Sequence, residues 1–278
     1  MAFALGATDR EAHVRGITLA YDDSAPEATG RDDRPVLLCL HAIGHGARDF
    51  AGLRAALAGQ WRIVAPDWPG QGNSGPDREP PTATRYADLA LGLLDTLGVA
   101  RAAVLGNSIG GAAALRLAAL HPDRVTGLVL IDGAGLAPIG PRERLAIHAF
   151  VALFRAGQRR RRWYRWAFAA YYRQLLRNPA AATHRSAIVA AGYDSAPVLA
   201  AAWRGFADLD IRDLAGQVRC PVLAAWARHD RVVPLAASRP ALERVADLTL
   251  SVFDAGHSPH VENPAEFEAV LRTFLKRL

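Results

Sequence analysis

The stretch that decides the fold reads Gly106-Asn107-Ser108-Ile109-Gly110-Gly111. It follows the apolar run 102–105 directly and opens the apolar helical pattern 109–120. A G-x-S-x-G string has chemical meaning in this context, because a sharp strand-to-helix turn needs small residues beside the serine. The turn exposes the hydroxyl of Ser108 at the top of a sheet, where the free N–H groups of a helix N-terminus can stabilise negative charge. The sequence therefore predicts that Ser108 is a nucleophile.

Apolar runs that end at Gly, Pro or Asp recur along the chain, and helical patterns alternate with them. Continuous apolar runs of this kind are typical of strands that are covered on both faces. Alternating strands and helices indicate a largely parallel α/β sheet with crossover helices on both sides. We expect strands at 36–40, 61–65, 102–105, 125–131, 221–227 and 248–253, and helices at 86–97, 109–120, 240–245 and 264–275.

The segment 136–212 breaks this alternation. It contains no good strand, and it is rich in alanine, arginine and aromatic residues. Its glycine and proline residues suggest about four short helices. The dividing residues are Gly157, Pro179, Gly192 and Pro197. We therefore expect an α/β core of residues 1–135 and 213–278, with 136–212 inserted as a helical lid over the carboxyl edge of the sheet.

A serine hydroxyl is a weak nucleophile and needs a base. His257 comes directly after the last predicted strand and is preceded by Gly256, so we expect it to be the base. His260 is the alternative, with a surface or supporting role as its other interpretation. The acid that orients the base should follow the preceding strand, where Asp230 stands. Asp132 also ends a strand at the same edge, and it is the alternative acid.

Acyl transfer further requires two N–H donors for the developing oxyanion. One is expected from Ile109, the residue after the nucleophile, and the other from the loop that follows the run 36–40. In that loop we expect Ile43 to donate, with Ala42 as the alternative. No cysteine or second ligand stands at metal-binding spacing there, so we expect no metal and no other cofactor. The residues expected to contact substrate are His45, Asn107, Trp163 and Trp166.

Composition excludes several classes of protein. The chain has 278 residues, of which 51% are hydrophobic and 22% charged, which suffices for a sizeable core. No stretch approaches the roughly 20 apolar residues of a membrane span, and the first ten residues do not resemble a signal peptide. Cys39 and Cys220 are too few for a disulfide framework and are expected to be free thiols in the cytoplasm.

The net charge of +6 raises the question of an anionic partner. Arginine supplies nearly all of the positive charge, and four arginines run together at 159–162. The simplest interpretation of that run is a solvated helix face, with an anionic partner or membrane surface as the alternative. No recognised nucleic-acid module appears, so we expect no nucleic-acid binding. We expect a small-molecule substrate and a monomer or homodimer.

Together these strings resemble the α/β-hydrolase superfamily over nearly the whole chain. The turn Asp67-Trp68-Pro69-Gly70-Gln71-Gly72-Asn73-Ser74 is similar to its D-x-x-G-x-G-x-S turn, and 255–264 is similar to its histidine loop. The order Ser108, Asp230, His257 also matches that fold. The resemblance implies an α/β-hydrolase fold with a catalytic triad. It says less about substrate, because one fold hosts many reactions.

Within the superfamily, the serine turn resembles that of carbon–carbon bond hydrolases acting on meta-cleavage products, as do 121–125 and 133–136. Ser258 and Pro259 stand where those enzymes tend to carry tryptophan. Carboxylesterases and enol-lactone hydrolases share the remaining pattern. The resemblance thus implies hydrolysis of a small or medium carboxylic ester, thioester or lactone through an acyl-serine. Carbon–carbon bond hydrolysis is the first alternative, and a ligand-binding receptor with little turnover is the second.

Overall fold

The apolar runs form one eight-stranded sheet in the computed structural model, which describes residues 10–25 and 32–278. The first nine residues, which carry most of the expectation of no signal peptide, lie outside that description. The strand order is β1-β2-β4-β3-β5-β6-β7-β8. The strands are β1 Arg10–Val14, β2 Ile17–Asp23, β3 Val36–Leu40, β4 Arg62–Pro66, β5 Ala102–Asn107, β6 Val125–Ile131, β7 Val222–Ala227 and β8 Leu248–Phe253.

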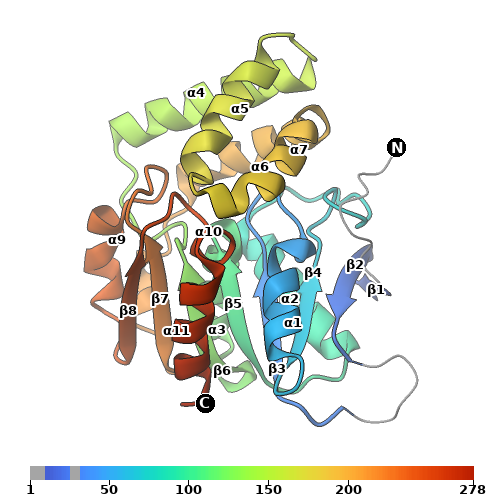
Figure 1. Ribbon diagram of the computed structural model, residues 1–278, viewed down its shortest axis with the longest axis vertical. Helices are drawn as coiled ribbons and strands as arrows, with labels where there is room; N and C mark the ends of the chain where they lie inside the picture. The colour runs from blue at the N-terminus through green and yellow to red at the C-terminus, as the bar shows by residue number, and fades with distance from the viewer. Residues whose placement is uncertain (1–9, 26–31) are drawn as a thin grey trace.

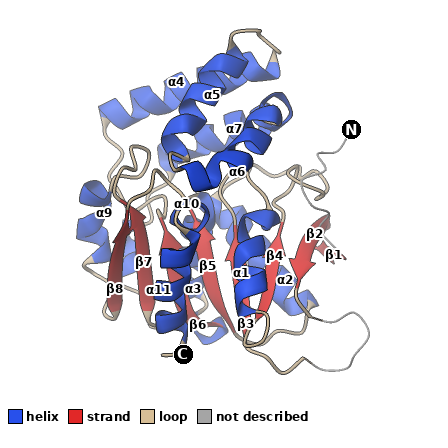
Figure 2. Ribbon diagram, viewed as in Figure 1, coloured by secondary structure: helices blue, strands red, loops and turns tan. Residues whose placement is uncertain are grey.

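Strands β3 to β8 are mutually parallel, and helices cover both faces of the sheet (Figure 2). Every residue of β3, β5 and β7 is buried, which explains why their sequences are continuously apolar instead of alternating. One core layer packs α1 (Ala51–Leu57) and α11 (Pro264–Leu275) against the sheet, and the other packs α2 (Ala83–Thr96) and α3 (Ile109–Leu120). The predicted fold class is thereby confirmed.

Sequence analysis missed the two strands β1 and β2, which form an antiparallel hairpin at the sheet edge. Arg15 and Gly16 join them, and both have positive φ, 50° and 83°. Positive φ at both central residues is the geometry of a type I′ turn, whose twist matches that of paired strands. The burial of β1 alternates along the strand, and this period-2 pattern was the available signal.

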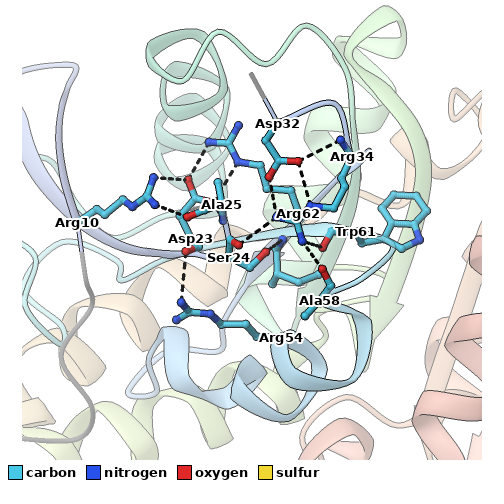
Figure 3. Close-up of polar contacts among 11 residues, drawn as sticks. Arg10, Asp23, Ser24, Ala25, Asp32, Arg34, Arg54, Ala58, Trp61 and Arg62 are labelled. Atoms are coloured by element: carbon cyan, nitrogen blue, oxygen red, sulfur yellow. Dashed lines mark hydrogen bonds and ion pairs between the residues drawn. The ribbon is translucent and has the colours of Figure 1, made fainter. Parts of the chain in front are cut away.

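Buried ion pairs fix this edge of the sheet (Figure 3). The carboxylate of Asp23, whose side chain is fully buried, accepts hydrogen bonds from Arg62 at 3.0 and 2.7 Å and from Arg10 at 3.2 Å. These contacts join β1, β2 and β4. Nearby, Arg34 pairs with Asp32 at 2.6 Å. Some of the many arginines of this chain therefore form structural ion pairs with carboxylates.

Two helices begin earlier than predicted. Helix α2 starts at Ala83 because the hydroxyl of Thr82 accepts the N–H of Arg85 at 3.2 Å and caps the helix. Helix α9 spans Leu235–Leu242, whereas the prediction placed a helix at 240–245. Pro240 lies inside α9 and does not begin it. The remaining short helices of the core are α8 Arg212–Ala215 and α10 Pro259–Glu262.

The inserted segment between β6 and β7 is helical and lies above the carboxyl ends of the strands (Figure 1). Its helices α4 and α7 are longer than expected, and Pro197 lies inside α7 instead of between helices. Helix α8 crosses the boundary expected at 212. The segment contains α4 Pro141–Gln158, α5 Tyr164–Leu175, α6 Ala182–Ala190 and α7 Gly192–Gly205. Within the described residues, every helix is too short or too polar to span a membrane.

Candidate active site

Ser108 occupies a strained turn between β5 and α3. Its φ of 56° and ψ of −117° are uncommon for any residue but glycine. The turn closes only because its neighbours lack side chains. A Cβ at Gly106 would lie 2.2 Å from the carbonyl oxygen of Gly110, and a Cβ at Gly110 would lie 2.2 Å from that of Leu40. The geometry therefore requires glycine at both positions.

We expect Gly110→Ala to destabilise the protein by about 1–3 kcal/mol or more, because the added methyl meets rigid backbone of β3 and not a flexible side chain. The measurement is urea unfolding followed by circular dichroism. Gly52→Ala is the matched control, since no atom lies within 4 Å of the added Cβ and the site is helical. Equal midpoints for the two variants would contradict the close approach.

His257 and Asp230 form a buried pair. The distance from His257 Nδ1 to Asp230 Oδ2 is 2.7 Å, and the side chains are only 5% and 0% exposed. The other carboxylate oxygen of Asp230 accepts the N–H groups of Val232 and Val233 at 2.7 and 2.9 Å. Three hydrogen bonds thus hold the carboxylate in one orientation toward the imidazole.

The two alternative residues lie nearby but make different contacts. His260 stacks on Phe50, both of its ring nitrogens lack a partner among the described residues, and burial lowers its pKa to about 3. Asp132 lies beside Asp230 and His257, with ligand atoms of all three within 4.8 Å. Burial, reinforced by the charge of Asp230, raises the pKa of Asp132 well above its ordinary value. Asp132 is therefore less acidic than an ordinary aspartate, and its Oδ1 accepts the N–H of Ala227 at 2.8 Å.

A buried glutamate that sequence analysis noted only as part of a string organises the histidine loop. Glu262 Oε1 accepts the N–H groups of Gly256, His257 and Ser258 at 2.8, 3.0 and 3.1 Å. Its Oε2 accepts those of Arg177 and Asn178, just beyond α5, at 2.7 and 3.2 Å. One carboxylate thus joins the loop that carries His257 to the end of α5.

The residues expected to form the oxyanion hole lie near the nucleophile. Ile43, Ser108 and His257 line one narrow cavity of about 20 Å³. Ile109 is the first residue of α3, so its N–H has no acceptor within the helix. The loop of Ile43 is held in place because Gly44 N–H donates to the side chain of Gln71 at 2.7 Å.

Buried polar contacts fix both ends of the same loop. His41 Nε2 accepts the N–H of Trp68 at 2.9 Å, and the indole of Trp68 donates to His41 O at 2.8 Å. Asp67 accepts the N–H groups of Ala47 and Asn73 at 2.8 and 3.0 Å. The D-x-x-G-x-G-x-S turn of the sequence is therefore a structural support for this loop.

His45 lies in the same narrow cavity as Ser108. Its Nδ1 is 2.7 Å from Asp49, whose other oxygen is 2.9 Å from His184 Nε2 on α6. Sequence analysis missed His184 because it lies 139 residues away from His45 along the chain. Among the described residues this trio and the group of Asp132, Asp230 and His257 bring three potential metal ligands within 4.8 Å. In both groups a histidine and an aspartate stand at hydrogen-bond distance.

The other residues predicted to contact substrate lie elsewhere. Asn107 is fully buried, and its side chain bonds His257 O at 3.1 Å and Ser258 Oγ at 3.1 Å, so it supports the histidine loop. Trp163 and Trp166 are 55% and 67% exposed, and neither lines a cavity that contains Ser108. None of these three residues thus lines a cavity that contains Ser108.

A larger cavity of about 510 Å³ opens beside Ser108. Its walls are mostly apolar and come from the start of α4, the end of α7 and the loop after β7. The residues that line it include Ile139, Ile147, Phe150, Trp203, Phe206, Leu209, Arg231 and Val233.

The sequence and the structure were compared with known proteins. The profile of the alpha/beta hydrolase family matches residues 37–270. The 2-hydroxymuconate semialdehyde hydrolase of Pseudomonas sp. (strain CF600) is 31% identical over 258 residues, which cover 86% of each chain. An esterase from Thermogutta terrifontis, solved with malate bound, matches 96% of this chain and 98% of its own at 26% identity and a TM-score of 0.77. An enol-lactonase from Burkholderia xenovorans LB400 matches 96% and 100% at 24% identity and a TM-score of 0.79, a likeness of fold alone.

Proposed function

Because this chain belongs to the alpha/beta hydrolase family, we propose that it is a serine hydrolase that cleaves a small or medium carboxylic ester, thioester or lactone through an acyl-serine. The observation that carries the proposal is the buried 2.7 Å contact between His257 and Asp230, with His257 and Ser108 on one cavity. A base fixed by an acid beside a strained serine is the arrangement that activates a hydroxyl.

The mechanism follows from these positions. His257 Nε2 takes the proton of Ser108 Oγ, which attacks the carbonyl carbon, while Asp230 stabilises the imidazolium through Nδ1–H. The carbonyl oxygen becomes an anion that accepts the N–H groups of Ile43 and Ile109. The bond to the leaving group then breaks, and that group takes the proton from His257. Water, deprotonated by His257, attacks the acyl-serine and releases the acid and the free hydroxyl.

The cavity of about 510 Å³ supports an apolar acyl or ring group of medium size. Helices α4 and α7 contribute walls to it, so we propose that the segment 136–212 acts as the lid of a core formed by residues 1–135 and 213–278. Cys39 and Cys220 are both free thiols. That is the state expected in a reducing compartment, which supports the proposal of a cytoplasmic enzyme.

Carbon–carbon bond hydrolysis of a ring-fission product is the second candidate. The observation that favours it is the 31% identity to the 2-hydroxymuconate semialdehyde hydrolase. A panel of p-nitrophenyl esters, thioesters, lactones and one dienol ring-fission product separates the candidates. Turnover of esters supports the acyl-serine proposal. Turnover of the ring-fission product alone supports carbon–carbon bond hydrolysis instead. If nothing reacts and a fluorophosphonate probe fails to label Ser108, a ligand-binding role on the same fold takes its place.

We expect kcat/KM to decrease at acidic pH, with an apparent pKa for His257 above its ordinary value of 6.5. Burial alone lowers the pKa of His257, but the charge of Asp230 and its hydrogen bond outweigh burial and raise it. The base works only when unprotonated, so activity is lost as pH falls through that raised value. The contribution of the His257–Asp230 ion pair to the free energy of unfolding has the opposite pH dependence. It is complete below the pKa of histidine in the unfolded chain, and it is lost as pH rises through the pKa of His257 in the folded protein. An acid limb centred below 6.5 would contradict this assignment.

A further inference from the structure

A second hollow of about 250 Å³ lies beside the cavity at Ser108. We name it the arginine hollow, and its five lining residues are Arg173, Gln174, Arg177, His229 and Arg231. All five side chains are polar, and four of them can carry positive charge. The two spaces adjoin, because Arg231 lines both of them. A hollow with such walls is suited to an anion and not to an apolar group.

The cations of the arginine hollow are free to bind. No side-chain hydrogen bond or ion pair links Arg173, Arg177 or Arg231 to any residue that the structure describes, in contrast to Arg62 at the sheet edge. Only His229 has a carboxylate partner, Asp254, at 2.9 Å, and that pair is exposed. Like charges gathered around one space repel one another unless an anion lies between them.

The hollow lies on the side of the catalytic base. His229 and Arg231 flank Asp230, which contacts His257. From the opposite wall, the end of α5 packs on the histidine loop, where a Cβ at Gly256 would lie 2.4 Å from Gln174 O. In acyl transfer the leaving group takes its proton from the histidine. The end of α5 lines the hollow and packs on the loop that carries His257, so the hollow is assigned here to the leaving group and the apolar cavity to the acyl group.

We propose that the arginine hollow binds an anionic group, a phosphate or a carboxylate, carried by the leaving group of the substrate. This inference rests on the proposed serine hydrolase function and adds a substrate class to it. The planar guanidinium presents paired N–H donors that match both anions, and three exposed arginines line this one hollow, so together they can hold a group that a single exposed ion pair would hold only weakly. The substrate class is therefore an ester or thioester with an apolar acyl group and an anionic leaving group.

The test compares two matched substrate pairs. The first pair is 3-carboxy-4-nitrophenyl butanoate and 4-nitrophenyl butanoate, which differ by one carboxylate. The second is S-butanoyl-4′-phosphopantetheine and S-butanoylpantetheine, which differ by one phosphate. In each pair the measured quantity is the ratio of kcat/KM for the anionic substrate to that for the neutral one. We expect the wild-type ratio to fall with rising ionic strength in at least one pair.

The variant Arg173→Gln/Arg177→Gln removes two charges from the hollow and is expected to lower that ratio about tenfold. Arg231 is left unchanged because it adjoins Asp230 in the chain. The matched control is Arg161→Gln/Arg162→Gln, which removes the same charge from exposed positions before α5 and should leave the ratio unchanged.

The outcomes separate the inference from the function on which it rests. A loss confined to the phosphate pair or to the carboxylate pair supports the inference and identifies the anion. Ratios that the Arg173→Gln/Arg177→Gln variant leaves unchanged in both pairs, or lowers no more than the control variant does, overturn it while the hydrolase function stands. If the wild type hydrolyses none of the four substrates, the proposed function fails for these classes and the inference fails with it.

Discussion

Replacing Ser108 by alanine is expected to lower kcat/KM for the best ester substrate by about 10⁴- to 10⁶-fold. The alanine keeps the fold of the turn but removes the only atom that would form the acyl intermediate, so what remains is binding and the oxyanion donors. The measurement is ester hydrolysis under saturating and limiting substrate, together with labelling by a fluorophosphonate probe. The variant should lose the label completely.

Ser195→Ala is the matched serine control. Among the described residues, the hydroxyl of Ser195 bonds only the carbonyl oxygens of Ala191, just before α7, and of Gly192, the first residue of α7, at 3.2 and 3.4 Å. This variant should therefore keep both activity and label. A Ser108→Ala protein that still hydrolyses the ester within tenfold of wild type and still takes the label would remove Ser108 from the mechanism.

The second large effect is expected at the acid. Asp230→Asn should lower kcat by about 10⁴-fold, because an amide cannot stabilise the imidazolium and favours the wrong tautomer of His257. The amide oxygen can still accept the N–H groups of Val232 and Val233, so the loop should keep its shape. The measurement is the single-turnover rate of acylation, with thermal unfolding to check that the variant is folded.

Asp132→Asn is the comparison that distinguishes the two carboxyl groups. Burial and the charge of Asp230 disfavour the charged form of Asp132, and the carboxylate that contacts His257 is that of Asp230, so an amide of the same shape at position 132 should leave most of the activity. The Oδ1 of Asp132 accepts the N–H of Ala227 at 2.8 Å, a bond that an amide oxygen can also accept. A large loss in Asp132→Asn with little loss in Asp230→Asn would reverse the assignment of the acid.

Much of the fold could be predicted because its strands are covered on both faces. Such strands are continuously apolar, and Val36–Leu40 and Val125–Ile131 match their predicted bounds. The edge strand Leu248–Phe253 also matches, although most of its residues are only half-buried. The edge hairpin of β1 and β2 was missed because it has few residues and mixes polar with apolar positions. A short alternating pattern gives a weaker signal than a long apolar run.

The candidate site was likewise predictable from the sequence only in part. Ser108, Asp230 and His257 each follow a strand, so chain position alone brings them to one edge of the sheet. Asn107 is the last residue of β5, a strand whose residues are all buried, and its side chain bonds the histidine loop, a contact between residues 150 positions apart that the sequence does not reveal. The exposure of Trp163 depends on which side of the inserted helices meets the core, which composition does not reveal.

Glu262 fixes the direction in which the entrance to the site can widen. Its five hydrogen bonds join the histidine loop to the end of α5, so that side of the inserted segment cannot lift without displacing His257. A movement that preserves these bonds has to swing α4 and the chain before it, which form the opposite wall of the larger cavity. We therefore expect the proposed lid to open on the side of α4, while the hydrogen bonds of Glu262 keep His257 in place.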